Sequence, residues 1–214
     1  MAVRAAPAGA EGPVYNQRVS VREHHSLSPA AAAVRVAVVT ASDSRTPDTD
    51  QGGALVRALA EAAGFSIAGS LLLREDPLVV REKVAALIAG GTVDAVLITG
   101  GTGVSGRDGT VEAVTPLLEK TLPGFGELFR MLSFAEIGAA AWLSRAFAGT
   151  AGKVAVFAMP GSPAGVRLAM ERLIVPELPH LVGQLRRHHD AGAPAASGHG
   201  HHGHGHHHGD GRDD

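Results

Sequence analysis

The residues best suited to chemistry lie in a glycine-rich segment over positions 100–110, which reads Gly-Gly-Thr-Gly-Val-Ser-Gly-Arg-Asp-Gly-Thr. Glycines let a ligand approach the backbone closely, and successive N–H groups in such a turn can form a nest for an anion. Asp108 lies inside the turn and could organise Mg²⁺ beside bound phosphate, because a metal that bridges phosphates needs only one or two protein carboxylates. Asp108 could equally be the N-cap of a helix over 110–118.

Two common phosphate-binding motifs fit this turn poorly. Gly101, Gly103 and Gly106 match the G-x-G-x-x-G pattern of dinucleotide-binding folds, but the match follows the third predicted strand and is succeeded by Arg-Asp-Gly rather than a helix. The same segment imitates the start of a P-loop, yet Arg107 and Asp108 stand where Lys and Ser or Thr would contact phosphate and Mg²⁺. Neither motif explains the turn.

Other acidic residues follow the predicted strands. Glu75 comes directly after the strand predicted over 67–73, where it could contact a ligand or simply favour the N-terminus of the next helix. Asp43 and Asp50 follow the strand predicted over 34–40 and could be turn and cap residues. The residues alone leave open whether either of them contacts a ligand.

Alternating strands and helices must position these residues. Apolar and β-branched patterns predict strands over 34–40, 67–73, 95–99 and 154–158, and helices over 53–63, over 77–89 and from Pro163 onward. This alternation predicts a three-layer α/β/α domain whose mostly parallel sheet is covered on both faces. Ligands of such sheets bind beyond the carboxyl ends of the strands, where the turn and the acids lie.

The segment Pro160-Gly161-Ser162 joins the last predicted strand to a helix. Ser162 is the expected N-cap and Pro163 the first helical residue. A helix N-terminus also offers free N–H groups to a phosphate, so a structural and a binding role can hold together.

Composition predicts a single domain over 34–187, a flexible arm over 1–33 and a disordered tail over 188–214 that is rich in Gly and contains nine of the 12 histidines. The tail could bind Ni²⁺ or Zn²⁺ without a preformed geometry. The formal charge of -2 argues against nucleic acid, and no apolar run reaches the about 18 residues that cross a membrane. The absence of Cys and of a signal-peptide pattern fits a cytoplasmic protein.

Five motifs in register resemble the MoaB/MogA family of molybdenum cofactor biosynthesis proteins, which also includes gephyrin. They lie at residues 99–103, 108–113, 123–127, 143–146 and 159–163. Residues 129–134 and 136–138 are closer to the MoaB branch. The resemblance implies binding of molybdopterin and its adenylylation with Mg²⁺ and ATP, with release of pyrophosphate. It also implies a homotrimer or a dimer of trimers, and partners among the other proteins that make the cofactor.

By the same resemblance, Asp108 and Glu75 are catalytic residues and Mg²⁺ ligands. Glu75 stands where MogA-type enzymes carry a second Asp, with Asp76 as the alternative one position away. Arg145 is the expected phosphate ligand. The residues implied in substrate binding are Asp50, Gly100, Gly101, Thr102, Gly103, Thr110, Glu112, Gly124, Gly126, Glu127, Ser144, Arg145, Pro160, Gly161 and Ser162.

Two other functions stay open. A protein of the same fold could carry or protect molybdopterin without transferring AMP, and a metal-storage protein could act through its His-rich tail. The apolar residues Phe125, Phe129, Met131, Leu132 and Trp142 are expected in the core or a subunit interface, and we predict no ligand contact for them.

Overall fold

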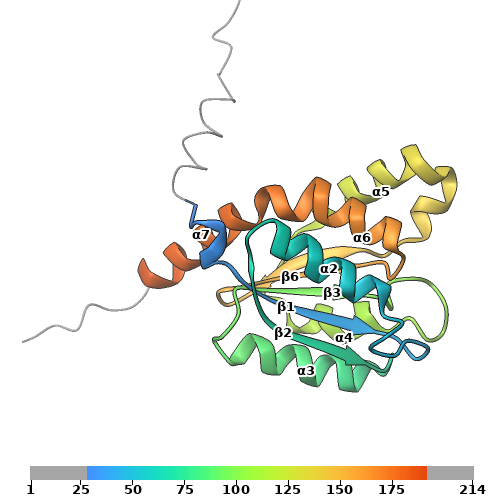
Figure 1. Ribbon diagram of the computed structural model, residues 1–214, viewed down its shortest axis with the longest axis horizontal. Coiled ribbons are helices and arrows are strands. Elements are labelled where there is room, and N and C mark those ends of the chain that lie inside the picture. The colour runs from blue at the N-terminus through green and yellow to red at the C-terminus, as the bar shows by residue number, and fades with distance from the viewer. Residues whose placement is uncertain (1–27, 192–214) are drawn as a thin grey trace, which may run out of the picture.

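The computed structural model describes residues 28–191, which form a sheet between two layers of helices (Figure 1). The six strands follow the order β2-β1-β3-β6-β5-β4 across the sheet. Neighbouring strands are parallel, except that β5 is antiparallel to both β6 and β4. The predicted mostly parallel sheet is therefore confirmed. The strands are β1 Arg35–Ala41, β2 Ser66–Leu73, β3 Ala95–Thr99, β4 Lys120–Thr121, β5 Phe147–Ala151 and β6 Val154–Met159.

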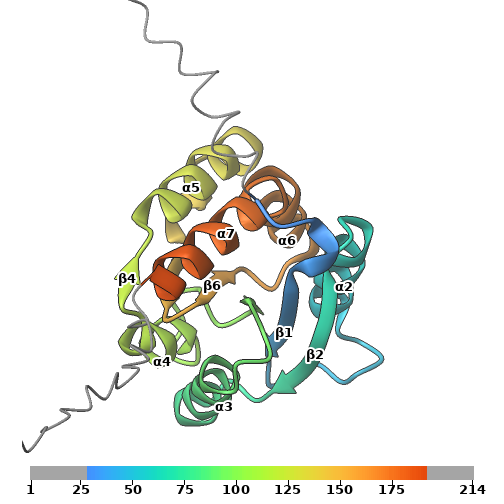
Figure 2. The same ribbon diagram turned by 90° about the vertical axis from the view of Figure 1, so that its left-hand side faces the viewer.

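Helices cover both faces of the sheet because alternate side chains of each strand point to opposite sides. Val36 and Val38 of β1 belong to one buried cluster, and Ala37 and Val39 belong to the other. In Figure 2 the two helical layers lie on opposite sides of the strands. The first cluster packs under α2 Gln51–Ala62, α5 Pro123–Ile137, α6 Pro163–Ala169 and α7 Val175–Ala191, and the second packs under α3 Pro77–Ala89 and α4 Thr110–Val114.

The helix predicted from Pro163 begins as expected and is interrupted later. The Ser162 hydroxyl accepts a hydrogen bond of 3.2 Å from the N–H of Gly165, so Ser162 is the N-cap. A wider π-helical turn, Met170–Ile174, separates α6 from α7. Pro176 and Pro179 follow it in α7, and neither can donate the backbone hydrogen bond that a regular helix requires there.

Two sequence-based expectations around α4 and β5 need correction. The predicted helix over 110–118 ends at Val114, and a short 3₁₀ turn that contains Pro116 follows it. Gly109 stands at the N-cap position without a side-chain hydrogen bond, so the N-cap interpretation of Asp108 is wrong. Strand β5 was not predicted because its sequence, Phe-Ala-Gly-Thr-Ala, contains two alanines and a glycine, which are depleted in strands.

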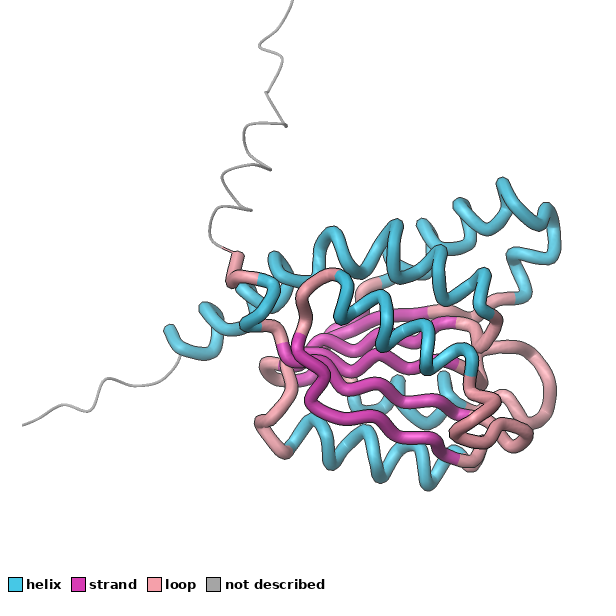
Figure 3. Tube along the Cα trace, in the orientation of Figure 1, coloured by secondary structure: helices cyan, strands magenta, loops and turns pink. Residues whose placement is uncertain are grey.

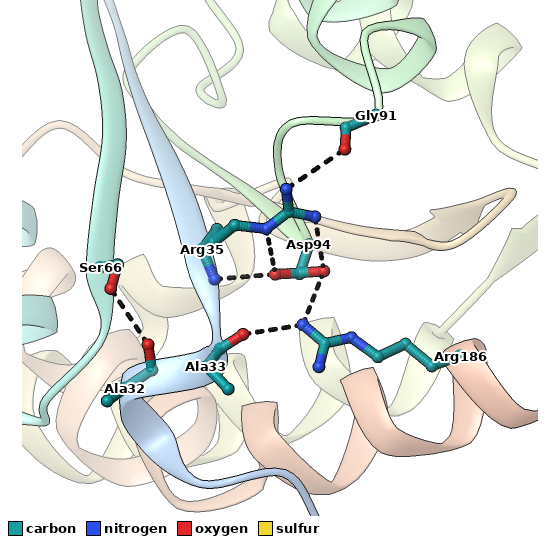
Figure 4. A network of polar contacts seen from close by, with 7 residues as sticks. All are labelled: Ala32, Ala33, Arg35, Ser66, Gly91, Asp94 and Arg186. Atoms are coloured by element: carbon teal, nitrogen blue, oxygen red, sulfur yellow. Dashed lines mark hydrogen bonds and ion pairs between the residues drawn. The ribbon is translucent and has the colours of Figure 1, made fainter.

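The sheet has two functionally different edges. The loops that follow β1, β2, β3 and β6 gather beyond the carboxyl ends of these strands, which we call the carboxyl edge (Figure 3). At the opposite amino edge, Asp94 accepts hydrogen bonds of 2.8 Å from the backbone and 3.0 Å from the side chain of Arg35. Arg186 of α7 donates to the same carboxylate at 2.9 Å and to the carbonyl of Ala33 at 2.8 Å (Figure 4). This ion-pair network fastens α7 to the start of β1.

The predicted domain boundary after residue 187 falls inside α7, which extends to Ala191. The predicted arm lies mostly outside the described residues, and residues 192–214 of the predicted tail lie wholly outside them, so both stay predictions. Within residues 28–191, no helix is both long and apolar enough to cross a membrane.

Candidate functional site

The glycine turn is shaped by contacts within the protein. Gly100 and Gly101 have φ angles of +99° and +64°, a region that favours glycine. A Cβ on Gly100 would collide with the carbonyl of Ala41, and one on Gly101 would collide with the hydroxyl of Thr110. That hydroxyl donates a 2.9 Å hydrogen bond to the carbonyl of Gly100. The two glycines therefore allow the turn to pack against β1 and α4, in addition to any role in admitting a ligand.

Asp108 is held by the turn itself. One oxygen of its carboxylate accepts a 2.7 Å hydrogen bond from the N–H of Ser105. A Cβ on Gly103 would come within 2.8 Å of the same oxygen, so glycine makes room for this carboxylate. Burial raises the pKa of Asp108, but hydrogen bonds from Ser105 and Gly103 outweigh burial and leave the pKa below its ordinary value. The carboxylate is therefore ionised at neutral pH.

Arg145 fastens the two ends of the turn together. Its guanidinium donates to the carbonyl of Gly103 at 2.6 Å and to the carbonyl of Asp108 at 2.9 Å, and it forms an ion pair with Glu112. The hydrogen bond from Arg145 lowers the pKa of the Glu112 carboxyl. The guanidinium therefore fixes the shape of the turn, and its role as a phosphate ligand stays a prediction.

A pocket of about 340 Å³ opens beside the turn. Its volume lies within the range of roughly 300 to 1,000 Å³ that is usual for small-molecule sites. Three segments from distant parts of the sequence form its walls: the glycine turn, the loop from β6 to α6, and one face of α5 with the 3₁₀ helix η3, Gly138–Leu143. The predicted site residues among its lining are Gly101, Thr102, Gly103, Asp108, Ser144, Pro160, Gly161 and Ser162.

The pocket also contains residues that sequence analysis missed. Phe129, Ser133, Glu136 and Ile137 line it from α5. Their spacing places them on one face of the helix, but the sequence does not reveal that this face meets the glycine turn. Phe129 is buried in the core, as expected, and it also lines the pocket.

Glu75 follows β2 at the carboxyl edge, within range of the charge of Asp108. Burial raises the pKa of Glu75, and the charges of Asp108 and Asp43 raise it further. The neighbouring Asp76 is the N-cap of α3, where it accepts hydrogen bonds of 2.8 Å from Leu78 and 3.4 Å from Val79. This cap occupies Asp76 and favours Glu75 as the second acid.

Carboxylate oxygens suit a hard cation such as Mg²⁺, and Asp108 and Glu75 supply them at this edge. No cluster of three or more acids, His or Cys with metal-binding geometry occurs among the described residues. The residues fit a cation that takes its remaining ligands from water and from phosphate oxygens, as Mg²⁺ bound with a nucleotide does.

The other predicted residues lie around the pocket rather than in it. Asp50 is buried as the N-cap of α2, where its two oxygens accept from the N–H of Gly53 and the hydroxyl of Thr40, both at 2.8 Å. Gly126 and Glu127 line a second cavity, which Ser144 and Arg145 also line. Gly124 lies at the start of α5, outside the lining of both cavities.

Comparison with known proteins places this geometry in a family. Residues 37–180 match the family model described as a probable molybdopterin binding domain. The chain belongs to this family. Molybdenum cofactor biosynthesis protein B of Bacillus subtilis (strain 168) is 47% identical over 170 residues, which cover 79% of this chain and 99% of the relative.

Solved structures agree with the assignment to this family. A crystal structure of molybdenum cofactor biosynthesis protein B shares 48% identity, covers 72% of this chain and 96% of its own, and has a TM-score of 0.70. The tungsten cofactor synthesizing protein MoaB from Pyrococcus furiosus shares 33% identity over 72% of this chain and 97% of its own, with a TM-score of 0.65. The resemblance read from the sequence motifs is therefore confirmed.

Proposed function

We propose that this protein binds molybdopterin in the pocket beside the glycine turn and adenylylates it with ATP during molybdenum cofactor biosynthesis. The observation that carries the proposal is the convergence of the turn, the loop from β6 to α6 and the ionised Asp108 around one pocket. Membership of a family described as a probable molybdopterin binding domain supports the choice of ligand.

In the proposed reaction, a phosphate oxygen of molybdopterin attacks the α-phosphorus of ATP, and pyrophosphate leaves with the electron pair of the broken P–O bond. No protein nucleophile is needed. The turn holds phosphate through its backbone N–H groups, and Asp108 and Glu75 would hold Mg²⁺. Bound Mg²⁺ would neutralise phosphate charge during the transfer, while the protein positions the two substrates.

A carrier that binds molybdopterin without transferring AMP is the second candidate. The observation that favours it is Glu75, which stands where MogA-type enzymes carry an Asp. Its longer side chain places the charge differently from the shorter Asp.

Assembly and location complete the proposal. Met131, Phe134 and Trp142 on α5 and η3 are 60%, 63% and 72% exposed, an apolar surface suited to a subunit interface. We assign this surface to the homotrimer or dimer of trimers that the resemblance implies.

The protein would act in the cytoplasm with the other proteins of cofactor synthesis, and its His-rich tail would bind Ni²⁺ or Zn²⁺.

One experiment separates the two candidates. Purified protein is incubated with molybdopterin, ATP and Mg²⁺, and adenylylated pterin and pyrophosphate are measured in a single turnover. Formation of both products supports the transferase. Tight binding of molybdopterin without either product supports the carrier, and absence of binding contradicts both.

A further inference from the structure

The α5 wall of the pocket carries polar groups that have no hydrogen-bond partner among residues 28–191. Ser133 is only 5% exposed, yet its hydroxyl makes no hydrogen bond with the described residues. Its oxygen is not among the side-chain atoms that are fully shielded from water without a partner, so this hydroxyl opens onto the pocket. Thr102 on the opposite wall is 2% exposed, and its hydroxyl likewise has no partner among residues 28–191. Both residues line the same pocket, so a ligand can satisfy both hydroxyls.

Glu136 stands one turn after Ser133 on the same face of α5 and also lines the pocket. It lies in the last turn of the helix, where the helix dipole disfavours negative charge, and this turn contains no basic residue. Within the described part of the chain, Glu136 makes no ion pair or hydrogen bond. The carboxylate of Glu136 therefore makes no contact with the described residues that would stabilise the fold.

We propose that Glu136 and Ser133 determine specificity by recognising the pyrimidine edge of the pterin ring. This inference rests on the proposed function and names the residues that choose its substrate. A pterin presents two adjacent donors, the ring N3–H and the exocyclic 2-amino group, and a carboxylate can accept from both. The Ser133 hydroxyl donates to the neighbouring 4-oxo group, while Phe129 and Ile137 contact the faces of the ring.

The pattern of hydrogen-bond donors distinguishes a pterin from adenine, the base of the second substrate, ATP. Adenine presents a donor next to an acceptor on its Watson–Crick edge, so a carboxylate there would meet one ring nitrogen lone pair and be repelled. The α5 wall therefore selects the pterin, and the adenosine part of ATP must lie elsewhere along the carboxyl edge.

The test measures binding of molybdopterin and its displacement by two simple pteridines. Pterin carries the 2-amino group, whereas lumazine carries a carbonyl in its place and would face the Glu136 carboxylate with an acceptor. Wild-type protein should prefer pterin over lumazine by about tenfold or more. Glu136→Gln should weaken molybdopterin binding by about 10- to 100-fold and lose the preference, since the amide can donate to the lumazine carbonyl. Ser133→Ala should weaken binding about three- to tenfold.

Stability separates a binding role from a structural one. Both variants should unfold at the wild-type temperature or above it, because neither loses a side-chain hydrogen bond to the described residues. Glu61→Gln is the matched control, since Glu61 is an exposed acid in the last turn of α2, outside the pocket. It should leave binding and preference unchanged.

The outcomes are distinct. If wild type binds molybdopterin and Glu136→Gln binds it equally well with the same preference, the inference is overturned and the proposed function stands. If AMP displaces molybdopterin from this pocket better than pterin does, the pterin assignment of the α5 wall is wrong. If wild type binds no molybdopterin, the proposed function fails and the inference fails with it.

Discussion

Asp94 and Asp108 lie at opposite ends of β3, and both have a pKa below the ordinary value for Asp, but for different reasons. At the amino edge, burial raises the pKa of Asp94, and hydrogen bonds from Arg35 and Arg186 overcome it. At the carboxyl edge, burial raises the pKa of Asp108, and hydrogen bonds from the side chain and backbone of Ser105 and from the backbone of Gly103 overcome it, with a smaller contribution from the charge of Arg145. Within the described residues, Asp94 has two guanidinium partners and Asp108 forms no ion pair.

The contrast explains how a carboxylate can stabilise the fold at the amino edge while another carboxylate stays available to a ligand at the carboxyl edge. A carboxylate surrounded by guanidinium groups has its charge compensated within the protein, so it stabilises the fold and binds nothing else. A carboxylate whose pKa is lowered mainly by hydrogen bonds from neutral groups keeps its negative charge available to a cation. The amino edge therefore fastens α7 to β1, while the carboxyl edge retains, beside the pocket, a carboxylate that forms no direct ion pair with the described residues.

The largest expected effect tests the carboxyl edge. Asp108→Asn keeps the size of the side chain and one oxygen that can accept from Ser105, but it removes the charge that would hold Mg²⁺. We expect adenylyl transfer to slow by roughly 10²- to 10⁴-fold, because several kcal/mol of transition-state stabilisation disappear. Molybdopterin affinity should survive. Single-turnover formation of adenylylated pterin at saturating Mg²⁺ and ATP gives the rate.

Asp94→Asn is the matched control, since it makes the same substitution at the other end of β3. It should leave the transfer rate unchanged. If wild type is active and Asp108→Asn transfers AMP equally fast, Asp108 has no role in catalysis. The proposed functional difference between Asp108 and Asp94 would then be wrong.

The carboxyl edge could be predicted from the sequence better than the amino edge, and the reason is physical. Glycines with positive φ and an Asp inside a turn leave a local pattern that can be read from positions 100–110. The partners of Asp94 lie 59 residues before it and far beyond it in α7, so only the folded chain brings them together. The α5 wall was missed for a similar reason, because helical spacing marks Ser133 and Glu136 as one face without saying what that face meets.

The second prediction tests the amino edge directly. Asp94→Asn leaves Arg35 and Arg186 without a charged partner and should lower the free energy of unfolding by about 2 to 3 kcal/mol at neutral pH. Denaturant unfolding measures this loss. Because the folded-state pKa of Asp94 is lowered, its stabilisation is present above the unfolded-state pKa and is lost as pH falls through the folded-state pKa. The difference between wild type and variant should therefore shrink in acid, and a constant difference would contradict the ion-pair explanation.

A smaller effect of opposite sign is expected for Glu75→Gln. The folded-state pKa of Glu75 is raised, so its ionised form costs stability, and that cost disappears as pH falls through the folded-state pKa. The variant should be more stable than wild type at pH 7, by on the order of 0.5 kcal/mol, and the difference should vanish in acid. Thermal unfolding between pH 4 and pH 8 measures it. A variant less stable than wild type at pH 7 would show that Glu75 supports the fold at the carboxyl edge.

The smallest effect is expected from removing residues 192–214, which leaves all of α7 and the Arg186 contact with Asp94 in place. Unfolding temperature and molybdopterin affinity should match wild type, while affinity for immobilised Ni²⁺ should fall because seven of the 12 histidines are lost. A second truncation after residue 187, the boundary predicted from composition, also removes the last four residues of α7 but keeps Arg186. If Arg186 is what fastens this helix to the sheet, the two truncations should unfold within about 0.5 kcal/mol of each other. A clear loss of stability in the second alone would mean that the end of α7 contributes to the amino edge beyond the ion pair, and that the domain ends at residue 191 rather than 187.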